Sequence, residues 1–534
     1  EPAGTGLART GPARTGARGA AGTWRLVGRA LRVRADTEVL FTRLFGSSAS
    51  GFWLDSAMPQ PGLARFSFMG DASGPLSETL TYRTGEANVL VTDSDGIRAE
   101  PGTMFDVLER RLAERRLAGG PQAVADAGPG RGAAGSPGGG TGLPFGFTGG
   151  YVGYFGYEMK ADCGASAAHR ATTPDSVWIF ADRLIAVDHE TGVSYVIAVH
   201  DDSDEMRSAA REWVEATARR VTALAEPGAF PLPGGPGDVH GAGADRAGEG
   251  AGLAGYLVRD PDSYRRDIAE CLRQLRLGES YEICLTNRLR LPFSGSDLAY
   301  YQRLRRANPA PYAALLRAGG VTVFSSSPER FLRIDPGPSR RVESKPIKGT
   351  APRQPDPGRD AQVAALLASG PKTRAENLMI VDLLRNDLGR VCEIGSVAVT
   401  RYMAVESYAT MHQLVSTVTG RLLPSVGPVE CVRRCFPGGS MTGAPKLRTM
   451  EIIDRLEPEA RGVYSGALGY FGLGGGADLS IVIRAAVRQG NTLTVGAGGA
   501  IVLGSDPGQE YEEMMLKAAA PLRAYPVRSR EALA

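Results

Sequence analysis

The chain has 534 residues, 43% of them hydrophobic, which is enough to bury a large core in one intertwined fold or in two domains. Its 61 basic and 58 acidic residues almost cancel, which argues against a nucleic-acid-binding protein. No apolar run reaches the roughly eighteen residues of a membrane-spanning helix, so we expect no membrane partner.

The N-terminal part of the chain is expected to be a mixed α and β region bounded by low-complexity segments. Residues 1–22, rich in Gly, Ala and Arg, predict a disordered leader or linker and lack the apolar core of a secretory signal. The N-terminal region follows at 23–225 and contains a flexible Gly/Pro-rich insertion at 118–144. A second Gly/Pro-rich segment, 226–255, predicts a flexible linker.

Regular elements are predicted at the end of the N-terminal region and throughout 256–525, before a short tail at 526–534. Alternating apolar residues at 177–200 predict a hairpin, and a helix is expected at about 203–225. Further helices are expected at 262–277, 297–307, 373–389 and 509–522, and strands at 281–291, 311–317, 320–334, 464–472, 478–488 and 492–503. Because no regular βαβ repeat occurs, the fold class predicted is α+β rather than a doubly wound sheet.

The six cysteines are scattered along the chain. This pattern is typical of reduced thiols in the cytoplasm, the expected location, rather than of a disulfide framework. Cys431 and Cys435 lie four residues apart in a helical stretch without a nearby His or further Cys. Core packing is therefore favoured over a zinc site.

Two glycine-rich motifs are similar to nucleotide-binding loops but are better explained otherwise. GLGGGA (472–477) lies between two predicted strands, so a hairpin turn is favoured over a dinucleotide site. GGSMTGAPK (438–446) carries Ala444 where the lysine of a P-loop would follow the second glycine, and it precedes a predicted helix. Its backbone N–H groups could bind an anion such as a substrate carboxylate, or form only a tight turn with a helix cap.

Eight segments occur in the order that is typical of one enzyme family. They are SSSPERF (325–331), KPIKGTAPR (345–353), AENLMIVDLLRNDLGRV (375–391), MHQLVSTVTG (411–420), GGSMTGAPK (438–446), RGVYSGALGYFG (461–472), SIVIRAAV (480–487) and GAGGAIVLGSDPGQEYEEMMLKA (496–518). Together they resemble the chorismate-utilising enzymes, which include the anthranilate, aminodeoxychorismate, isochorismate and salicylate synthases. The resemblance implies that 256–525 is the chorismate-binding catalytic region.

The resemblance also extends, more loosely, into the N-terminal region through FWLDSA (52–57), ARFSFMG (64–70) and GGYVGYFGYE (149–158). It implies a large mixed two-layer β-sheet core flanked by helices, as in the anthranilate synthase component I fold. The family has an N-terminal tryptophan pocket, which is regulatory in anthranilate synthases. Leu54, Asp55 and Ser56 lie in the matching segment.

Lys348, the residue before Gly-Thr in the PI-x-GT segment, distinguishes members of this family. Anthranilate synthases carry alanine there, whereas this chain resembles the aminodeoxychorismate synthases, which carry lysine. Relatives that add water to chorismate carry a lysine base at the position of Glu282 and a glutamate acid at that of Lys345, and this chain has neither. The resemblance therefore implies 4-amino-4-deoxychorismate synthesis in p-aminobenzoate biosynthesis, for folate or an antibiotic.

The resemblance assigns the catalytic roles to three residues. Lys348 would be the nucleophile, which requires that burial or a nearby cation such as Lys345 lower its pKa. Glu329 would be the general acid or base for the departing hydroxyl, and His412 would lie near that leaving group.

Three glutamates would bind magnesium. By resemblance Glu376 and Glu513 would be ligands, with Glu510 close behind them, and carboxylates suit this hard cation. From the residues alone, Glu376 could equally be a first-turn glutamate on a helix, and Glu510 and Glu513 an exposed acidic helix start.

The remaining site residues would bind substrate, through hydrogen bonds, positive charge or a close approach of the backbone. They are Ser440, Thr442, Tyr464, Arg484, Gly498, Gly499 and Lys517. Arg484 suits a carboxylate because its guanidinium donates two parallel hydrogen bonds, and an arginine in an apolar strand needs such a partner.

The expected small-molecule partners are chorismate and ammonia. No G-x-C-x-G glutaminase turn occurs, so with glutamine the chain should need an amidotransferase subunit, or a glutaminase domain fused upstream of Glu1. Two alternatives remain open at this stage: anthranilate synthase component I, and a catalytically silent regulatory paralogue.

Overall fold

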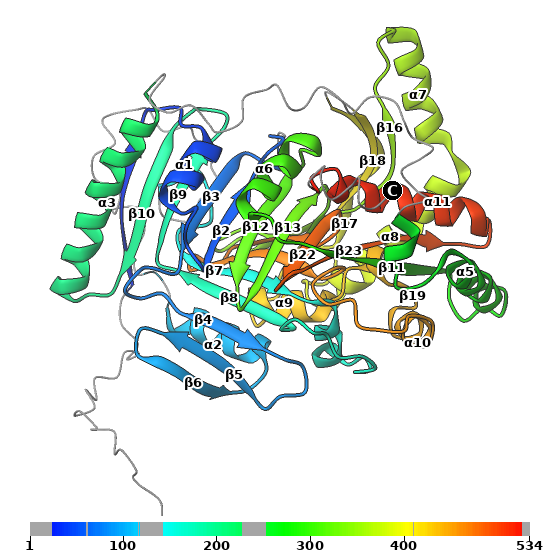
Figure 1. Ribbon diagram of the computed structural model, residues 1–534, viewed down its shortest axis with the longest axis horizontal. Coiled ribbons are helices and arrows are strands. Elements are labelled where there is room, and N and C mark those ends of the chain that lie inside the picture. Colours follow the sequence, from blue (N-terminus) through cyan, green and yellow to red (C-terminus); the bar gives the residue numbers. More distant parts are fainter. Residues whose placement is uncertain are drawn as a thin grey trace, which may run out of the picture.

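The computed structural model describes residues 24–59, 62–115, 117, 142–226, 253–408 and 411–525 (Figure 1). The predicted leader at 1–22 and tail at 526–534 lie outside these residues. So do the predicted insertion at 118–144 and linker at 226–255, except at their ends.

Eleven strands form the first sheet, which combines residues from both halves of the chain. Its order is β1 (Arg25–Leu31), β10 (Ser194–His200), β9 (Arg183–Asp188), β3 (Phe66–Asp71), β2 (Gly51–Asp55), β12 (Tyr312–Ala318), β13 (Val321–Ser327), β22 (Ala485–Gln489), β23 (Thr492–Ile501), β11 (Glu282–Pro292) and β19 (Gly443–Ala444). The central pairing joins β2 to β12, so the N-terminal region and the region after residue 253 share this sheet.

The second sheet contains twelve strands and is shared in the same way. Its order is β16 (Ile347–Pro352), β18 (Met411–Arg421), β15 (Arg341–Lys345), β14 (Arg330–Ile334), β21 (Ala477–Ile481), β20 (Ala467–Gly472), β7 (Gly150–Phe155), β8 (Ser176–Ala181), β4 (Thr79–Tyr82), β5 (Asn88–Asp93) and β6 (Gly96–Pro101), with β17 (Ala398–Ser407) beside β18. All pairs of named strands are antiparallel, so the two-layer core is confirmed but its sheets are not mixed in direction.

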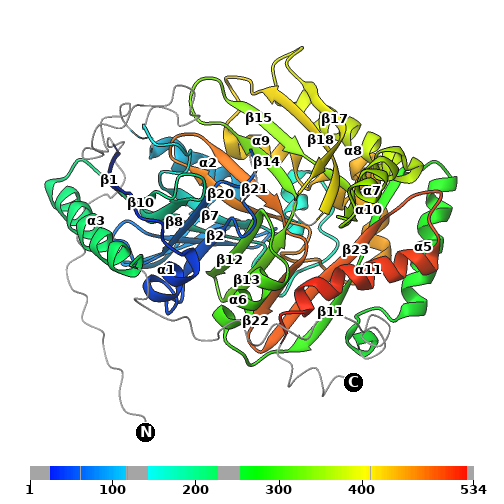
Figure 2. The same ribbon diagram turned by 90° about the horizontal axis from the view of Figure 1, so that it is seen from above.

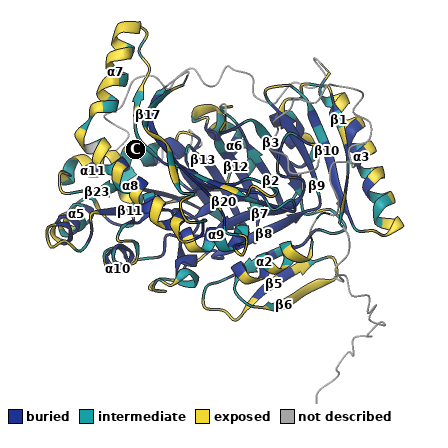
Figure 3. Cartoon of the chain, turned by 180° about the vertical axis from the view of Figure 1, so that it is seen from behind, coloured by how far each residue is buried: buried dark blue, intermediate teal, exposed yellow. Residues whose placement is uncertain are grey.

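Helices surround the two sheets (Figure 2). They are α1 (Thr37–Leu44), α2 (Met104–Glu114), α3 (Asp204–Leu224), α5 (Pro261–Arg276), α6 (Asp297–Ala307), α7 (Pro357–Ser369), α8 (Pro371–Gly389), α9 (Pro428–Cys435), α10 (Lys446–Leu456) and α11 (Pro507–Leu522), with the short 3-10 helices η1 (Tyr157–Cys163), η3 (Ala254–Tyr256) and η4 (Gly439–Met441). The α+β class is thus confirmed. Of these helices α7 buries no residue, and it projects from the body of the molecule (Figure 3).

The core is divided by the first sheet. Neighbouring residues of a strand face opposite sides of its sheet. In β2, Phe52 joins the cluster that includes residues of the second sheet, such as Tyr151 and Leu479. Its neighbour Trp53 joins the cluster on the opposite face, under α1, α5, α6 and α11. The space between the two sheets is therefore lined by alternate residues of each strand.

Local sequence signals account for several of the predicted elements. Helix α5 begins at Pro261 because the side chain of Asp260 accepts hydrogen bonds from the N–H groups of Asp262 and Ser263. The hairpin predicted at 177–200 is confirmed for β9 and β10, which pair with Ser194 opposite Val187, whereas residues 177–181 belong to β8 of the other sheet. The GLGGGA turn is also confirmed, as it joins β20 to β21.

Two predicted strands are each divided between the sheets. The run at 320–334 becomes β13 in the first sheet and β14 in the second, and Pro328, which has no N–H to donate, stands at the break. The run at 478–488 becomes β21 in the second sheet and β22 in the first. Its break contains Arg484, whose φ of 50° is incompatible with a continuous strand. Both breaks carry predicted site residues.

All six cysteines are unpaired, and Cys431 and Cys435 lie in the core, as the sequence predicted. In the described part of the chain no helix combines the length and the apolar character needed to cross a membrane.

Candidate active site

The side chain of Lys348 links the two sheets. Its Nζ donates a hydrogen bond to Oε1 of Glu282 over 3.1 Å, and the glutamate is fully buried. Lys348 stands where the register between β16 and β18 is irregular, and such irregularities re-aim side chains. Glu282 begins β11 and shares its face with Cys284, which joins the core cluster between the sheets. The Oε2 atom of Glu282 has no hydrogen-bond partner among the described residues.

The charge around Lys348 differs from the expectation. Burial lowers the pKa of Lys348, but the carboxylates of Glu282, Glu376 and Glu329 raise it above its usual value. The neighbouring Lys345 does not lower it, because Lys345 forms an ion pair with Glu406 at 2.9 Å. The expected depression of the Lys348 pKa is therefore wrong for the site as it stands, and the lysine is held in its charged form.

Glu329 lies in the chain crossing between β13 and β14 and is buried. Burial raises the pKa of Glu329 to about 7, while a hydrogen bond from the Ser440 side chain and the charge of Lys348 lower it and Glu282 raises it. A carboxyl group with this pKa can hold a proton near neutral pH and give it up. The structure thus brings Glu329, Ser440 and Lys348 together.

Thr442 is not joined to this group by its side chain. Its hydroxyl is directed to the carbonyl oxygens of Gly438 and Gly439 in its own turn, at 3.4 and 3.3 Å. Its backbone carbonyl accepts from the N–H of Cys284 over 2.8 Å. The contribution of Thr442 is to anchor the turn against β11.

Arg484 and Tyr464 form a second part of the site. Burial lowers the pKa of Arg484, whereas Tyr464 and Glu513 raise it and Arg523 lowers it further. Within the described residues the Arg484 guanidinium makes no hydrogen bond or ion pair. A part-buried arginine without a partner is suited to receive a carboxylate from a ligand.

Lys517 connects α11 to the glycine-rich strand β23. Its Nζ donates to the carbonyl oxygen of Gly498 over 2.9 Å and pairs with Glu513 at 2.8 Å. Burial raises the pKa of the Cys284 thiol, while Arg461, Lys348 and Lys517 lower it. Lys348 and Lys517 thus both act electrostatically on a thiol of β11.

The two glycines of β23, both predicted to let the backbone approach the substrate, have different surroundings. A side chain at Gly498 would place its Cβ 2.3 Å from the carbonyl oxygen of Leu285, so the neighbouring strand already requires glycine there. A Cβ at Gly499 would lie 3.2 Å from Oε2 of Glu510, on the side of α11. Only one of these neighbouring residues can face the space between the sheets.

The predicted metal ligands do not form a compact cluster. Glu510 is buried and accepts a hydrogen bond from Ser505 over 2.6 Å, and Glu513 pairs with Lys517. Glu376 lies on α8 and acts on Lys348 electrostatically. In the part of the chain that the structure describes, no three His, Cys, Asp or Glu side chains are arranged to hold a metal ion.

His412 is placed differently from the other catalytic candidates. Its Nε2 lies 2.9 Å from Oδ1 of Asp360 on α7, and its Nδ1 lies 2.7 Å from the Ser407 hydroxyl. Both ring nitrogens therefore face protein groups rather than Glu329 or Lys348.

Three important contacts were not anticipated from the sequence. Position 282 was used only to show that the lysine base of the water-adding relatives is missing, yet Glu282 is the partner of Lys348. An acid within the apolar run YEICL could have indicated such a partner, because a buried charge needs one. The other two are the Asp360 contact of His412 and the buried pair of Arg461 with Glu457.

A separate cavity of about 290 Å³ is lined by strands of both sheets. Leu54, Asp55 and Ser56 lie on its wall with Arg333 and Tyr470, whereas Lys348 and Glu329 do not. The segment that resembles the family's N-terminal pocket therefore borders a real cavity, apart from the Lys348 site.

The sequence is similar to one protein family and to several named enzymes. The model of the chorismate binding enzymes matches residues 112–523. An aminodeoxychorismate synthase of Streptomyces pristinaespiralis is 48% identical over 505 residues, which cover 94% of this chain and 65% of the relative. The aminodeoxychorismate synthase component 1 of Salmonella typhimurium is 36% identical over 379 residues, covering 69% of this chain and 74% of that protein. The chain thus spans less than two thirds of the length of the first relative.

A solved structure supports the same fold. Anthranilate synthase component I from Streptococcus pneumoniae aligns with a TM-score of 0.64 and 25% sequence identity, covering 92% of this chain and 98% of that one. The α+β fold that the sequence predicted is therefore shared with that enzyme.

We predict that Glu282→Gln lowers the pKa of Lys348, because it removes one of the carboxylates that hold the lysine charged. Cyanate is small and carbamylates only the neutral amine, so the pH at which Lys348 is modified reports its pKa by peptide mass analysis. Modification should begin at lower pH in the variant, and its rate at a given pH should rise about tenfold each time the pKa of the lysine falls by one. Glu406→Gln, which removes the partner of Lys345, is the matched control. If carbamylation of Lys348 began at the same pH in Glu282→Gln and in the wild type, Glu282 would not be the group that raises the pKa of Lys348.

Proposed function

Because this chain belongs to the chorismate-binding enzyme family, we propose that it replaces the ring hydroxyl of chorismate with an amino group to give 4-amino-4-deoxychorismate. The observation that carries the proposal is the buried Lys348 amine, held by Glu282 and within the electrostatic reach of Glu329. The name of the Streptomyces pristinaespiralis relative supports the same reaction.

Lys348 is the proposed nucleophile and must first lose a proton. Oε1 of Glu282, at 3.1 Å from Nζ, is placed to accept that proton. The neutral amine attacks ring carbon 2, the two ring double bonds shift, and the bond from carbon 4 to its hydroxyl breaks. Glu329 donates a proton to the hydroxyl, which leaves as water. Ammonia then attacks carbon 4, the double bonds return, and the amine of Lys348 is released.

The protonated form of Glu329 is the active one in the first step. Since burial raises its pKa to about 7, the rate of this step should fall as the pH rises through that value. The Ser440 hydroxyl, which bonds to the same carboxyl, opposes the effect of burial and lowers the pKa by stabilising the charged form.

Positive groups in the second part of the site would bind the carboxylates of chorismate. Arg484, free of protein partners within the described residues, and Tyr464 beside it suit one carboxylate. Lys517 adds positive charge next to β23.

Magnesium fits the chemistry of the acidic residues. Mg²⁺ is usually held by one or two protein carboxylates together with waters and substrate oxygens, so a three-ligand cluster is not required. Glu376 and Glu513 would hold it, with Glu510 behind them. When bound, the ion would supply positive charge to a carboxylate of the substrate.

Ammonia would come from a glutaminase, as a separate subunit or a fused domain. The name "component 1" of the Salmonella typhimurium relative supports a second component in that protein. We propose that the product enters p-aminobenzoate synthesis in the cytoplasm, for folate or for an antibiotic.

The assay of this function is product analysis by mass spectrometry after incubation with chorismate, magnesium and ammonium. We predict 4-amino-4-deoxychorismate and no anthranilate. Lys348→Ala and Lys348→Arg should both lower kcat by at least about a hundredfold, because neither can form the covalent bond. Lys348→Arg keeps a positive partner for Glu282, so substantial activity in that variant would assign the lysine a purely electrostatic role.

A magnesium requirement is the next prediction. Chelation should abolish the amination, and added Mg²⁺ should restore it. Glu376→Gln should raise the magnesium concentration needed for half-maximal activity by about tenfold or more, because one ligand is lost. Asp382→Asn, on the exposed face of the same helix, is the control and should leave this concentration unchanged. Full activity in the presence of a chelator would contradict the metal assignment.

A further inference from the structure

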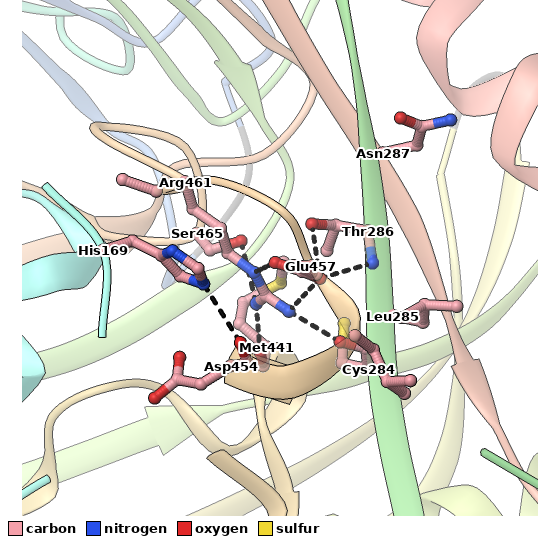
Figure 4. Close-up of polar contacts among 12 residues, drawn as sticks. His169, Cys284, Leu285, Thr286, Asn287, Met441, Asp454, Glu457, Arg461 and Ser465 are labelled. Atoms are coloured by element: carbon pink, nitrogen blue, oxygen red, sulfur yellow. Dashed lines mark hydrogen bonds and ion pairs between the residues drawn. The ribbon is translucent and has the colours of Figure 1, made fainter. Parts of the chain in front are cut away.

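A buried ion pair lies beside the site but is not part of it. Arg461 and Glu457 are 4% and 5% exposed, and the guanidinium contacts both carboxylate oxygens, with each N···O distance 2.7 Å (Figure 4). Burial raises the pKa of Glu457, but Arg461 lowers it below its usual value, so the pair stays charged. A pair that is buried in this way contributes net stability only when its other hydrogen bonds are also made.

The remaining N–H groups of Arg461 are bound to protein atoms. Nη1 donates to the carbonyl oxygen of Met441 over 2.7 Å and lies 3.4 Å from the Ser465 hydroxyl, and Nη2 donates to the carbonyl oxygen of Cys284 over 2.7 Å. With Nε on Glu457, each of the three nitrogens has an acceptor. Arg461 therefore has no donor left for a substrate and can act only through the groups it holds.

Glu457 holds the same strand from a second point. Its Oε1 accepts from the N–H of Thr286 over 2.8 Å and from the Thr286 hydroxyl over 2.9 Å. Cys284 and Thr286 share the face of β11 that carries Glu282, the partner of Lys348. Figure 4 shows the pair against β11, between the strand and the loop that carries Ser465. The pair thus fixes the segment of β11 that follows Glu282.

The contact with Met441 reaches the other side of the site. Met441 follows Ser440 in η4, and the Ser440 side chain bonds to Glu329. No other side chain among the described residues bonds to the Met441 carbonyl oxygen. A shift of this carbonyl would move the Ser440 hydroxyl relative to Glu329.

We propose that Arg461, with Glu457 as its counter-ion, is a positioning residue: by holding the carbonyl groups of Met441 and Cys284, it sets the contact of Ser440 with Glu329 and the place of Glu282 beside Lys348. The assay of this inference rests on the proposed function. The acid Glu329 is faced by Ser440 from η4, by Lys348 from β16 and by Glu282 from β11.

The test compares the pH dependence of kcat at a constant concentration of free ammonia. In Arg461→Lys one ammonium group replaces three nitrogens and cannot bridge Glu457, Met441 and Cys284 together. We predict that kcat falls about 10- to 100-fold with little change in KM for chorismate, as expected for a misplaced catalytic group. The alkaline limb of the pH profile, where kcat falls as the pH rises, should move to higher pH. The reason is that the Glu329 carboxylate loses the hydrogen bond that lowers its pKa.

Two further variants identify the route of the effect. Ser440→Ala should move the alkaline limb by a similar amount. The double variant should move it no further, because both substitutions remove the same contact, that of Ser440 with Glu329. Lys160→Gln is the matched control, since the Lys160–Asp454 pair, with N···O distances of 2.6 Å, is also largely buried but, within the described part of the chain, makes no hydrogen bond to Met441, Cys284, Ser440 or Glu282. It should lower the melting temperature without moving the limb.

The outcomes separate this inference from the proposed function. If wild type makes the aminated product but the limb of Arg461→Lys stays in place, the positioning role is overturned and the function stands. If wild type makes no such product, the function itself fails. If Arg461→Lys does not fold, Glu457→Gln is the substitute, because glutamine keeps the shape of the pair. The alkaline limb of its kcat profile should move in the same direction by a smaller amount. An unchanged limb in Glu457→Gln would then overturn the inference.

Discussion

The hydrogen-bonded ion pair between Lys348 and Glu282 is the contact on which the site depends. It joins β16 of the twelve-stranded sheet to β11 of the eleven-stranded sheet at 3.1 Å, and the glutamate is fully buried. Burying a lysine is unfavourable unless opposite charge compensates it. Three carboxylates do so here, and they hold the amine charged until one proton moves. The same groups that stabilise the lysine in the fold therefore also hold it in its charged form, which is not nucleophilic.

The chain crossings between the sheets carry two other predicted site residues. Glu329 lies where β13 passes into β14, and Arg484 lies where β21 passes into β22. A residue within a paired strand must face one side of its sheet, whereas a residue at a crossing is free of that alternation. An acid and an arginine from distant parts of the sequence thus both lie where the chain passes from one sheet to the other. The crossing also explains why the backbone of Arg484 has a positive φ.

Local patterns in the sequence were sufficient for most elements but not for their pairing. The periodicity of residues 203–225 predicted α3, and the alternation at 177–200 predicted the β9–β10 hairpin. The runs at 320–334 and 478–488 were each expected to be one strand, because alternation says nothing about which sheet a strand joins. The interleaving of the two halves of the chain in both sheets was hidden for the same reason.

The site shows the same limit. Resemblance identified Lys348 and Glu329, whose charges act on each other in the structure, but it did not identify Glu282 as the partner of the lysine. A nucleophilic Lys348 was expected to have its pKa lowered by burial or by a cation such as Lys345. Burial does lower it, but three carboxylates raise it by more, and Lys345 pairs with Glu406. Gly498 was predicted to let the backbone approach the substrate, and the requirement of the neighbouring strand for glycine at this position was not foreseen. Each of these depends on contacts between residues far apart in the sequence.

The most direct test of the account is the intact mass of the chain after rapid quenching with chorismate in the absence of ammonia. The account predicts an added mass of one chorismate less one water, located on Lys348 by peptide mapping and released by ammonia. Turnover to the aminated product without such an adduct, or an adduct on another residue, would contradict it.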